Sequence, residues 1–460
     1  MSTYDLTRTG LENFLAANQI DVSTTNSIIK YLQSDGLLTT PGSTVAVQES
    51  GYPPFDPPPV QVLIVDSSPA EVATNSALKV IVDIDDATLA VTGGNNVLVA
   101  MSSGNDSVDL SGSSGNDVVI AGPGNDTVTG GSGADSIYGD GGNDSLMGSS
   151  GNRSLIDGGN GNDIIVGGNG NYDTITTGGG NDDITGGNGN YDSIKAGNGN
   201  DNITGGNGNY DTITAGNGND DITGGNGNYD SIKAGNGNDD IHGGNGNYDS
   251  IKAGSGNDNI HGGNGNYDTI TAGDGNDVIH GGNGNYDSIK AGSGNDDIHG
   301  GNGNHDTIVG GSGNDTIHGG NGNYDSIGGG GGGDVIWAGN GNYETVTGGG
   351  GNDVIHGGSG SHELLEGNGG NDTIFAGTGG DTLTGNNGND LFVIGRTGDD
   401  TVQGGSGSSD AIKFTGENSH NAVYTPHGSE TTITFTDNPG QSISVTGVEE
   451  LIFTDKTVPI

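Results

Sequence analysis

A nineteen-residue repeat runs through the middle of the sequence and constrains its fold more than any other feature. From Gly186, the unit Gly-Gly-Asn-Gly-Asn-Tyr-Asp-Ser-Ile-Lys is followed by Ala-Gly-Asn-Gly-Asn-Asp-Asn-Ile-Thr, which is ten residues and then nine. An apolar residue stands two positions after each acid, as in Asp182 and Ile184. This period is too short for a helical hairpin repeat, and Gly at such density disfavours helix. The repeat therefore predicts two turns and two short strands per coil, with the coils stacked into an all-β parallel solenoid.

The period places acidic residues in two columns along the stack. The first column advances by one repeat at a time through Asp163, Asp182, Asp201, Asp220, Asp239, Asp258, Asp277, Asp296, Asp315, Asp334, Asp353 and Asp372. The second comprises Asp173, Asp192, Asp211, Asp230, Asp249, Asp268, Asp287, Asp306 and Asp325, and it continues as Glu344 and Glu363. A plainer spacing of nine residues precedes both columns, at Asp117, Asp126, Asp135 and Asp144, with Arg153 in the next slot. Paired strands are about 4.8 Å apart, so stacked carboxylates at that spacing repel one another strongly.

The composition shows that packing cannot overcome this repulsion. The 460 residues include 99 Gly and no Cys, only 28% are hydrophobic, and 11 Lys and Arg stand against 59 Asp and Glu, a net charge of −48. Two buried Ile per coil contribute roughly 2 kcal/mol each, whereas ordering a residue costs about 1 kcal/mol or more. A bound cation must therefore stabilise the fold. Ca²⁺ suits the pattern because it takes about six to eight hard oxygen ligands, and Gly-rich turns can aim carbonyls inward.

Two stretches show the repeat motif in full: Gly310-Gly311-Ser312-Gly313-Asn314-Asp315-Thr316-Ile317-His318 and Gly130-Gly131-Ser132-Gly133-Ala134-Asp135-Ser136-Ile137-Tyr138. The motif resembles the nonapeptide of the RTX, or haemolysin-type calcium-binding, proteins. The resemblance implies a parallel β-roll in which the Asp carboxylates and turn carbonyls of stacked loops share many Ca²⁺ ions. We expect the chain to be mostly unfolded without calcium, so that folding and binding are one event. The competing interpretations are a calcium-free Gly/Asp solenoid and a disordered tail.

Every second unit of the block departs from the nonapeptide by one extra residue before its acid. The inserted residues are Tyr172, Tyr191, Tyr210, Tyr229, Tyr248, Tyr267, Tyr286, Tyr324 and Tyr343, with His305 and His362 in the same column. The motif supports calcium at these ten-residue turns less than in the Asp163–Asp372 column. The rings are predicted to form an aromatic ladder, which either stiffens the roll or offers a contact stripe for self-assembly or a glycan.

Two further columns are predicted to face outward. One comprises His242, His261, His280, His299, His318 and His356, interrupted by Trp337, and it suits a solvated sheet face or a stripe for transition metals. The other comprises Lys195, Lys233, Lys252 and Lys290, alternating with Thr214 and Thr271, and it suits solubility and charge relief. The string His362-Glu363-Leu364-Leu365-Glu366 superficially resembles a zinc-protease helix. It aligns in frame with the repeat, so we interpret it as a degenerate repeat.

The composition shifts along the chain predict four regions. Residues 1–52 form a small helical segment, 53–103 a Pro-rich linker with ion-free capping strands, 104–390 the calcium-binding roll, and 391–460 a β-rich secretion and capping region. The helical prediction rests on apolar positions such as Leu6 and Phe14. The ending Gly447–Asp455 resembles the C-terminal region of RTX proteins exported by type I secretion, and this agrees with the expected lack of a cleaved N-terminal signal.

Acidity argues against nucleic acid and anionic membranes as partners, and no apolar run approaches the length of a membrane span. No catalytic motif is evident, so we expect no enzyme activity. The sequence predicts a secreted, calcium-binding structural or adhesive protein of the cell surface or extracellular matrix, with the type I secretion apparatus as a partner. The alternatives are the calcium-binding export module of a secreted hydrolase or toxin, a ligand-binding roll for ice or glycan, and a released calcium buffer or signal.

Overall fold

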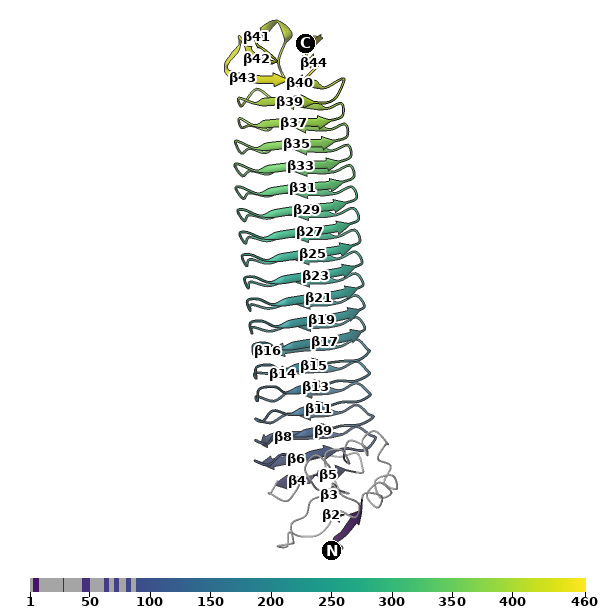
Figure 1. Cartoon of the computed structure of the whole chain (residues 1–460). Coiled ribbons are helices and arrows are strands. Elements are labelled where there is room, and N and C mark those ends of the chain that lie inside the picture. Colours follow the sequence, from purple (N-terminus) through teal and green to yellow (C-terminus); the bar gives the residue numbers. More distant parts are fainter. Residues whose placement is uncertain are drawn as a thin grey trace. The chain divides into compact units, whose positions relative to one another are not determined.

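The computed structural model describes residues 88–460 without interruption. Before them it describes residue 28 and the strands β1 (Thr3–Thr7), β2 (Thr44–Glu49), β3 (Val62–Val65), β4 (Ala70–Ala73) and β5 (Val80–Asp83). The chain divides into two compact units, Met1–Gly227 and Asn228–Ile460, which we call unit 1 and unit 2. Each unit contains a stack of coils, and each coil contributes one strand to sheet A and one to sheet B (Figure 1).

In unit 1, the strands of sheet A are joined in parallel, each to the equivalent strand of the next coil. After β3 and β5 they are β7 (Leu98–Ala100), β9 (Val118–Ile120), β11 (Ser136–Tyr138), β13 (Leu155–Asp157), β15 (Thr174–Thr176), β17 (Ser193–Asn198) and β19 (Thr212–Asn217). Sheet B has the same parallel arrangement. After β4 it contains β6 (Thr88–Gly93), β8 (Ser107–Ser113), β10 (Thr127–Thr129), β12 (Ser145–Met147), β14 (Ile164–Gly168), β16 (Asp183–Gly187), β18 (Asn202–Thr204) and β20 (Asp221–Thr223).

Unit 2 repeats this arrangement. Its sheet A contains β21 (Ser231–Asn236), β23 (Ser250–Ser255), β25 (Thr269–Asp274), β27 (Ser288–Ser293), β29 (Thr307–Ser312), β31 (Ser326–Gly331), β33 (Thr345–Gly350), β35 (Leu364–Gly369), β37 (Thr382–Asn387) and β39 (Thr401–Gly405). Its sheet B contains β22 (Asp240–His242), β24 (Asn259–His261), β26 (Val278–His280), β28 (Asp297–His299), β30 (Thr316–His318), β32 (Val335–Trp337), β34 (Val354–His356), β36 (Thr373–Phe375), β38 (Leu391–Ile394) and β40 (Ala411–Phe414).

The core follows from the alternation of side chains along each strand. In β17, Ile194 points inward and Lys195 outward, and Ile194 pairs in register with Ile213 of the next coil. The predicted Ile columns of both sheets are buried, with Ile203 and Ile241 fully inaccessible. A third buried position was not anticipated. It is the small first residue of many turns, such as Ala196 and Ala253, which fills the space between the sheets beside the turn.

The C-terminal part of unit 2 closes the stack with larger apolar side chains and antiparallel strands. It contains the short helix η1 (Ser419–Asn421) and the strands β41 (Ala422–His427), β42 (Glu430–Phe435), β43 (Asn438–Thr446), β44 (Glu450–Ile452) and β45 (Thr457–Pro459). Strand β43 extends sheet A beyond β39, and β44 extends sheet B beyond β40. Phe414 packs on Phe435 and Phe453, with ring centroids 5.3 and 5.1 Å apart. These rings cover the last coil, as the end of a solenoid requires.

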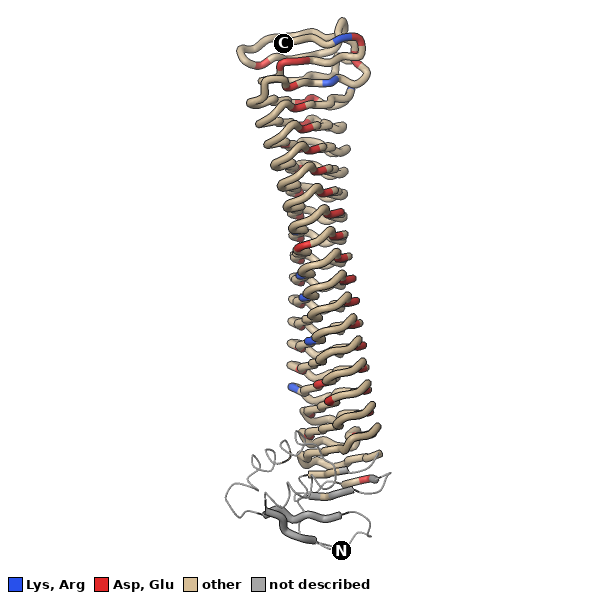
Figure 2. Tube along the Cα trace, turned by 90° about the vertical axis from the view of Figure 1, so that its right-hand side faces the viewer, with Lys and Arg blue, Asp and Glu red and all other residues tan. Residues whose placement is uncertain are grey.

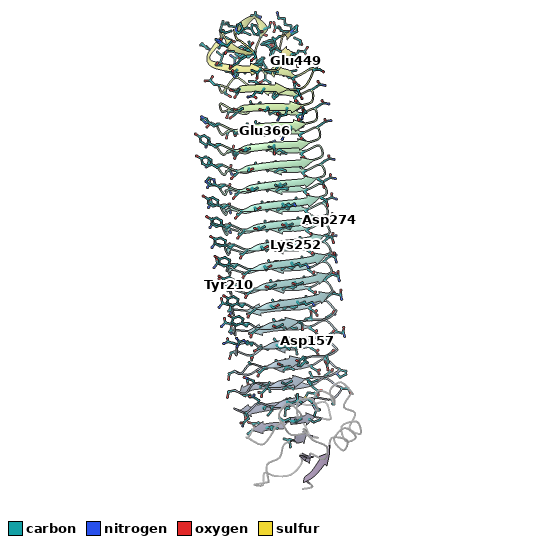
Figure 3. All side chains as sticks on the ribbon, viewed as in Figure 1. Asp157, Tyr210, Lys252, Asp274, Glu366 and Glu449 are labelled. Carbon is teal, nitrogen blue, oxygen red and sulfur yellow. The ribbon has the colours of Figure 1, made fainter. Side chains whose placement is uncertain are left out.

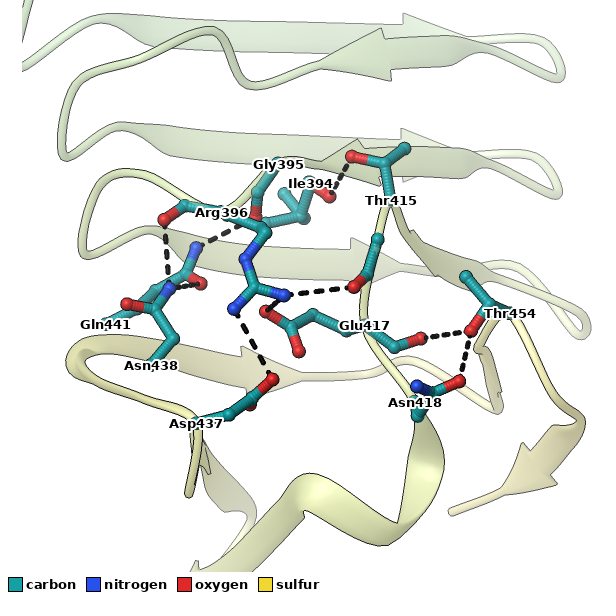
Figure 4. Close-up of polar contacts among 11 residues, drawn as sticks. Ile394, Gly395, Arg396, Thr415, Glu417, Asn418, Asp437, Asn438, Gln441 and Thr454 are labelled. Carbon is teal, nitrogen blue, oxygen red and sulfur yellow. Dashed lines mark hydrogen bonds and ion pairs between the residues drawn. The ribbon is translucent and has the colours of Figure 1, made fainter.

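Buried charge and polar groups also hold this cap together. Glu417 is completely buried, and its Oε1 pairs with Nη1 of Arg396 at 3.1 Å (Figure 4). The same guanidinium donates to the Gly416 carbonyl at 3.0 Å and pairs with Asp437 at 3.4 Å. Burial raises the pKa of Glu417, and the Arg396 charge opposes that rise. Removing Arg396 would therefore leave a buried acid unpaired.

The described residues correct the helical prediction for residues 1–52 in part. β1 contains Leu6, and β1 and β2 pair as antiparallel strands. The β-branched Thr44-Val45 start of β2 suits a strand better than a helix. Ile28, another position of the helical prediction, is helical and buried, whereas Phe14 and most of the others lie outside the described residues. In the part of the chain that the structure describes, no helix is long and apolar enough to cross a bilayer.

Candidate metal sites in the turns

The turns form two rows, one for each direction of crossing between the sheets. Turns from sheet A to sheet B have the nine-residue motif, as between β17 and β18, and their acids form the first row. Turns from sheet B to sheet A have ten-residue units in the regular block, as between β18 and β19, and their acids form the second row. Asp126 and Asp144 belong to the first row, whereas Asp117 and Asp135 belong to the second.

The Asp side chains of each row are tied to the preceding coil by one carboxylate oxygen, whereas neither oxygen of Glu344 has a hydrogen-bond partner. The backbone N–H of Asp163 donates to Oδ1 of Asp182 at 2.8 Å, and that of Asp258 donates to Oδ1 of Asp277 at 2.8 Å. The second row repeats the contact, since Asp173 donates to Oδ1 of Asp192 at 2.8 Å. These bonds fix the orientation of the Asp side chains. They leave the second oxygen, Oδ2, to be satisfied by another group.

In the first row, that second oxygen is buried and has no hydrogen-bond partner. This is true of Oδ2 in Asp126, Asp144, Asp163, Asp182, Asp201, Asp258, Asp277, Asp296, Asp315, Asp334, Asp353, Asp372, Asp390 and Asp410. An unpaired buried carboxylate oxygen is costly, and this cost is repeated coil after coil. The first row therefore requires a positive ligand that no side chain of the described residues supplies.

The space beside Oδ2 is bounded by backbone oxygen. A Cβ added at Gly310, the first residue of its motif, would meet both Oδ2 of Asp315 and the Gly329 carbonyl oxygen of the next coil. The Gly329 position repeats this arrangement with Asp334 and Gly348. In the coils with glycine at this position, such as Gly310, Gly329 and Gly348, carboxylate and carbonyl oxygens of successive coils thus lie close together, whereas an Ala methyl group occupies the equivalent position in coils such as that of Ala253. Hard oxygen ligands of this kind are the ones that Ca²⁺ prefers.

Burial also raises the pKa values of several of these acids. Desolvation is the largest cause for Asp277, where backbone hydrogen bonding opposes it and neighbouring carboxylates add to it, and its pKa rises to about 7. The pKa of Asp163 rises to about 6 and that of Asp192 to about 7 for the same leading reason. Glu344 has the largest rise, to about 9, because burial is joined by repulsion from Glu363 and Asp325. Both rows therefore hold carboxylates that need a cation or a proton at neutral pH.

The donor set favours calcium over a transition metal. Across residues 88–460 and the short strands before them, no three His, Cys, Asp or Glu side chains gather closely enough to hold an ion by themselves. An ion at the first row must therefore take much of its coordination from turn carbonyls. Ca²⁺ accepts such a mixture, whereas softer metals prefer thiolate and imidazole. The residues present fit calcium.

The second row places its carboxylates differently. A Cβ at Gly189, the fourth residue of its turn, would meet Oδ2 of Asp192 at 2.6 Å, whereas one at Gly186, the first residue, would meet Cδ1 of Ile194 at 2.9 Å. Asp192 is 6% exposed, compared with 1% for Asp163. The extra residue of the ten-residue turn therefore shifts the carboxylate along the turn. Its acids, from Asp173 to Asp325, remain predicted ligands.

The inserted aromatic residues adopt the strained backbone conformation that the longer turn requires. Tyr191 and Tyr248 have φ of +63°, the left-handed region that non-glycine residues seldom adopt. Their rings stack in unit 1 from Tyr172 to Tyr210 at 4.8–4.9 Å, and in unit 2 from Tyr229 to His362 at 4.8–5.2 Å. Each Tyr remains about half exposed, and Figure 3 shows the rings along one edge of the coils. The predicted aromatic ladder is present.

Arg153 requires a correction. The structure places Ser154 in the acid slot, where its N–H donates to Oδ1 of Asp173 at 2.8 Å. Arg153 occupies the position of the inserted ring, with φ of +67° and its guanidinium 5.5 Å from the Tyr172 centroid. The reason is that the ten-residue turn begins here, one repeat earlier than the first Tyr. Counting by nines along the sequence could not reveal the added residue.

Several members of the rows were missed because the period breaks near residue 372. The first row continues from Asp372 to Asp390 and Asp410, at steps of 18 and 20 residues, and Glu449 ends it by accepting the Asp410 N–H at 2.8 Å. The second row continues from Glu363 to Asp381 and Asp400. The Gly-x-Asp part of the motif can still be recognised at Gly388-Asn389-Asp390. A search that allowed for a repeat one residue shorter or longer would have found these acids.

The predicted His column and the His362–Glu366 string can also be placed in the structure. The imidazoles from His242 to His318 stack at 4.7–4.9 Å on the outer face of sheet B, and Trp337, His356 and Phe375 continue the stack. His362 stacks on Tyr343 at 4.9 Å, and the N–H of Glu363 donates to Asp381, so both belong to the repeat.

The RTX calcium-binding nonapeptide repeat matches the sequence within residues 102–408, leaving only 324–343 and 362–365 of that stretch unmatched. These matches cover more than half of the 460 residues. The chain belongs to the RTX calcium-binding repeat family. Its RTX repeats bind Ca²⁺ at many sites, and the buried first-row oxygens show where the chain needs it. No curated protein matches the sequence.

Proposed function

We propose that this RTX protein is a secreted structural or adhesive component of a cell surface or extracellular matrix, folded by calcium after export. The observation that carries the proposal is the first row of buried, unpartnered carboxylate oxygens. Such a row opposes folding where free calcium is scarce and supports it where calcium is abundant, because binding to the folded state alone shifts the equilibrium. A chain of this kind stays unfolded in the cytosol and folds outside the cell.

Export by the type I apparatus suits this switch. The channel would receive an unfolded chain, and millimolar calcium outside would fold it on emergence. The segment Gly447–Asp455, on which the proposed export signal rests, follows β43 directly and includes β44. RTX proteins are typically type I substrates, which supports the assignment to this class.

The regular faces of the coils favour a structural role over an enzymatic one. Repeats from Asp163 to Asp372 keep the same turn and strand pattern at each coil, which favours an extended surface over one enclosed pocket. A hollow on unit 2 is lined by Gly349, Asn368, Gly369, Asn386, Asn387, Gly405 and Ser406, without an acid or His that could serve as a general base. The export module of a larger hydrolase or toxin remains the alternative.

The stacked tyrosines bear on the adhesive part of the proposal. Because the rings lie nearly parallel, with interplanar angles of 3–5° among the tyrosines, each ring face is covered by its neighbours. The ring edges and hydroxyl groups are what the solvent meets. This arrangement suits polar contacts with a partner surface better than stacking of sugar rings on aromatic faces.

The test combines a calcium titration with assays of the alternatives. Purified full-length protein is titrated from chelated to millimolar calcium while circular dichroism reports folding and light scattering reports assembly. We expect β-structure to appear together with particles larger than a monomer. Folding into monomers that hydrolyse a peptide, ester or glycosidic substrate would overturn the structural proposal in favour of the enzymatic class.

A further inference from the structure

Between residues 183 and 297 the two outer faces of the coils carry opposite charges, whereas Asp157 and Glu366 occupy the sheet A column in coils outside this stretch. Of the chain's 11 Lys and Arg residues, all four that lie between Arg153 and Arg396 stand in one outward column of sheet A: Lys195, Lys233, Lys252 and Lys290. The outer face of sheet B carries an acidic column instead: Asp183, Asp221, Asp240 and Asp297. In each unit the inward Ile separates the two faces, so these columns point away from each other. In Figure 3, Lys252 lies on the sheet face and not at the ring edge.

These charges are available to a partner. All four lysines are exposed, and none of the ion pairs within the described part of the chain involves them. Two of the carboxylates accept a hydrogen bond on their own face, since Nδ2 of Asn259 donates to Oδ1 of Asp240 at 3.1 Å and Nδ2 of Asn202 donates to Oδ1 of Asp183 at 3.3 Å. Nδ1 of His242 lies 3.8 Å from Asp240, and Nδ1 of His299 lies 3.6 Å from Asp297. About half of the Asp240 and Asp297 side-chain surface remains exposed. Figure 2 shows how few basic positions the molecule carries compared with its acidic ones.

The two columns are also matched along the sequence. Asp183, Asp221 and Asp240 are each followed, twelve positions later, by a lysine, namely Lys195, Lys233 and Lys252. Where the acid is replaced by Asn202 or Asn259, the residue at the same offset is Thr214 or Thr271. Lys290 and Asp297 stand outside this match, since their counterparts are Val278 and Val309. In the matched coils, each Asp on the sheet B face is accompanied by a Lys on the sheet A face of the same coil. Charged residues that served solubility alone would not need to be paired in this way.

We propose that sheet A of one copy docks on sheet B of a second copy, side by side and with the coils running in the same direction. In this arrangement a sideways shift brings the lysine column of one molecule against the aspartate column of the next. In unit 1 the constant offset places Lys195 opposite Asp183 and Thr214 opposite Asn202. In unit 2 it places Lys252 opposite Asp240 and Thr271 opposite Asn259. Opposite charges favour this register, and like charges disfavour pairing of two A faces or two B faces.

The geometry of this contact makes the assembly open-ended. The contact joins two different faces, A of one molecule and B of the next, so it is heterologous. Each docked molecule keeps one unpaired face for a further copy, so the assembly does not close. The acidic column comprises seven coils from Asp183 to Asp297, three in unit 1 and four in unit 2. A three-residue strand is about 10 Å long and coils are about 4.8 Å apart, so these coils offer roughly 350 Å² per face, below the ~800 Å² of a standard stable interface. Each contact is therefore weak, and the product is a salt-sensitive array.

The inference rests on the proposed structural function and names the partner, a second copy of this chain. Its test uses two charge-reversed full-length proteins. One carries Lys195→Glu, Lys233→Glu, Lys252→Glu and Lys290→Glu. The other carries Asp183→Lys, Asp221→Lys, Asp240→Lys and Asp297→Lys. Each has two like-charged faces, so each alone should stay monomeric in calcium, whereas a 1:1 mixture should assemble because every docked pair is again complementary.

Sedimentation and light scattering in millimolar calcium give the readout. We expect the unchanged protein to associate in about 50 mM salt and to lose at least tenfold in association on moving to about 500 mM, where the screening length falls below the range of a surface pair. The control protein carries Lys413→Glu and Lys456→Glu, which lie outside the lysine column. It is compared with a double variant of the same charge change within the column, Lys233→Glu with Lys252→Glu. The control should assemble like the unchanged protein.

Three results would overturn the inference. They are assembly by either reversed protein alone, failure of the mixture to assemble, and assembly that is lost on Tyr248→Ser with Tyr267→Ser but kept on charge reversal. The last result would move the contact to the aromatic ladder and leave the structural function intact. Circular dichroism separates this from failure of the proposed function, which would appear as no folding in calcium.

Discussion

At the scale of single residues, the two oxygens of a turn carboxylate have different roles. Oδ1 of Asp277 accepts the Asp258 N–H and aligns the coils, whereas Oδ2 is buried without a partner. An Asn at this position keeps an oxygen for the first role and removes the charge needed for the second. The same substitution should therefore have opposite effects with and without calcium.

We predict that Asp277→Asn lowers the melting temperature in millimolar calcium by about 2–6 °C, since a lost ion ligand costs on the order of 1–2 kcal/mol. In calcium-free buffer at pH 8 it should leave residual structure unchanged or increased, because a buried charge is gone. Thermal scans by circular dichroism measure both. The exposed Asp109→Asn, outside the proposed docking columns, is the matched control and should change neither. A loss of stability in both conditions would contradict the assigned role of Oδ2.

The raised pKa values give a pH prediction whose sign can be worked out. Folded acids with pKa near 6 to 7, such as Asp163 and Asp277, hold protons that the unfolded chain releases near its ordinary value of 3.8. The folded state then binds more protons between about pH 4 and 7, so calcium-free stability rises as pH falls through that range. Calcium-depleted protein should gain β-signal from pH 8 to pH 5. Calcium binding at pH 6 should release protons into a weakly buffered solution, and unchanged pH on binding would count against buried acids as ligands.

At the scale of turns, glycine is needed where the next coil approaches closely. Gly216 has φ of +128°, and a Cβ there would meet the Gly197 carbonyl oxygen. At Gly179, by contrast, the nearest atoms to an added Cβ are 3.7 and 4.0 Å away. We expect Gly216→Ala to destabilise the calcium-loaded protein by more than about 1 kcal/mol and Gly179→Ala to be nearly neutral. Urea unfolding in calcium compares the two, and equal effects would show that coil approach is not limiting.

The sequence predicted the elements well wherever the nineteen-residue frame holds. The Ile columns, the aromatic ladder and strands such as Leu391–Ile394 are found as expected. Arg153 was misplaced because an added residue is invisible to a fixed step, and Asp390 and Asp410 were missed because their steps are 18 and 20. The different positions of Oδ2 in the two rows depend on turn geometry, which spacing does not encode. The β1 strand depends on pairing with β2, which local patterns do not reveal.

At the scale of the whole molecule, the net charge of −48 and the thin core indicate that the chain needs bound calcium to fold. Ions in the turns would offset the buried acids and leave the outer lysine and aspartate columns as the charges that a partner meets. Folding and contact between copies would then respond to the same ion, the first through the turn rows and the second through the faces that folding creates.

The most direct test of the central claim is a far-ultraviolet circular dichroism titration of the full chain at pH 7.5, with Ca²⁺ and Mg²⁺ in parallel and bound calcium counted by equilibrium dialysis. We predict an unfolded spectrum in chelator, cooperative gain of β-signal with Ca²⁺ but not with Mg²⁺, and bound ions numbering at least the first-row acids with unpartnered oxygens. A chelated protein that keeps its β-signal and its melting temperature would contradict the account.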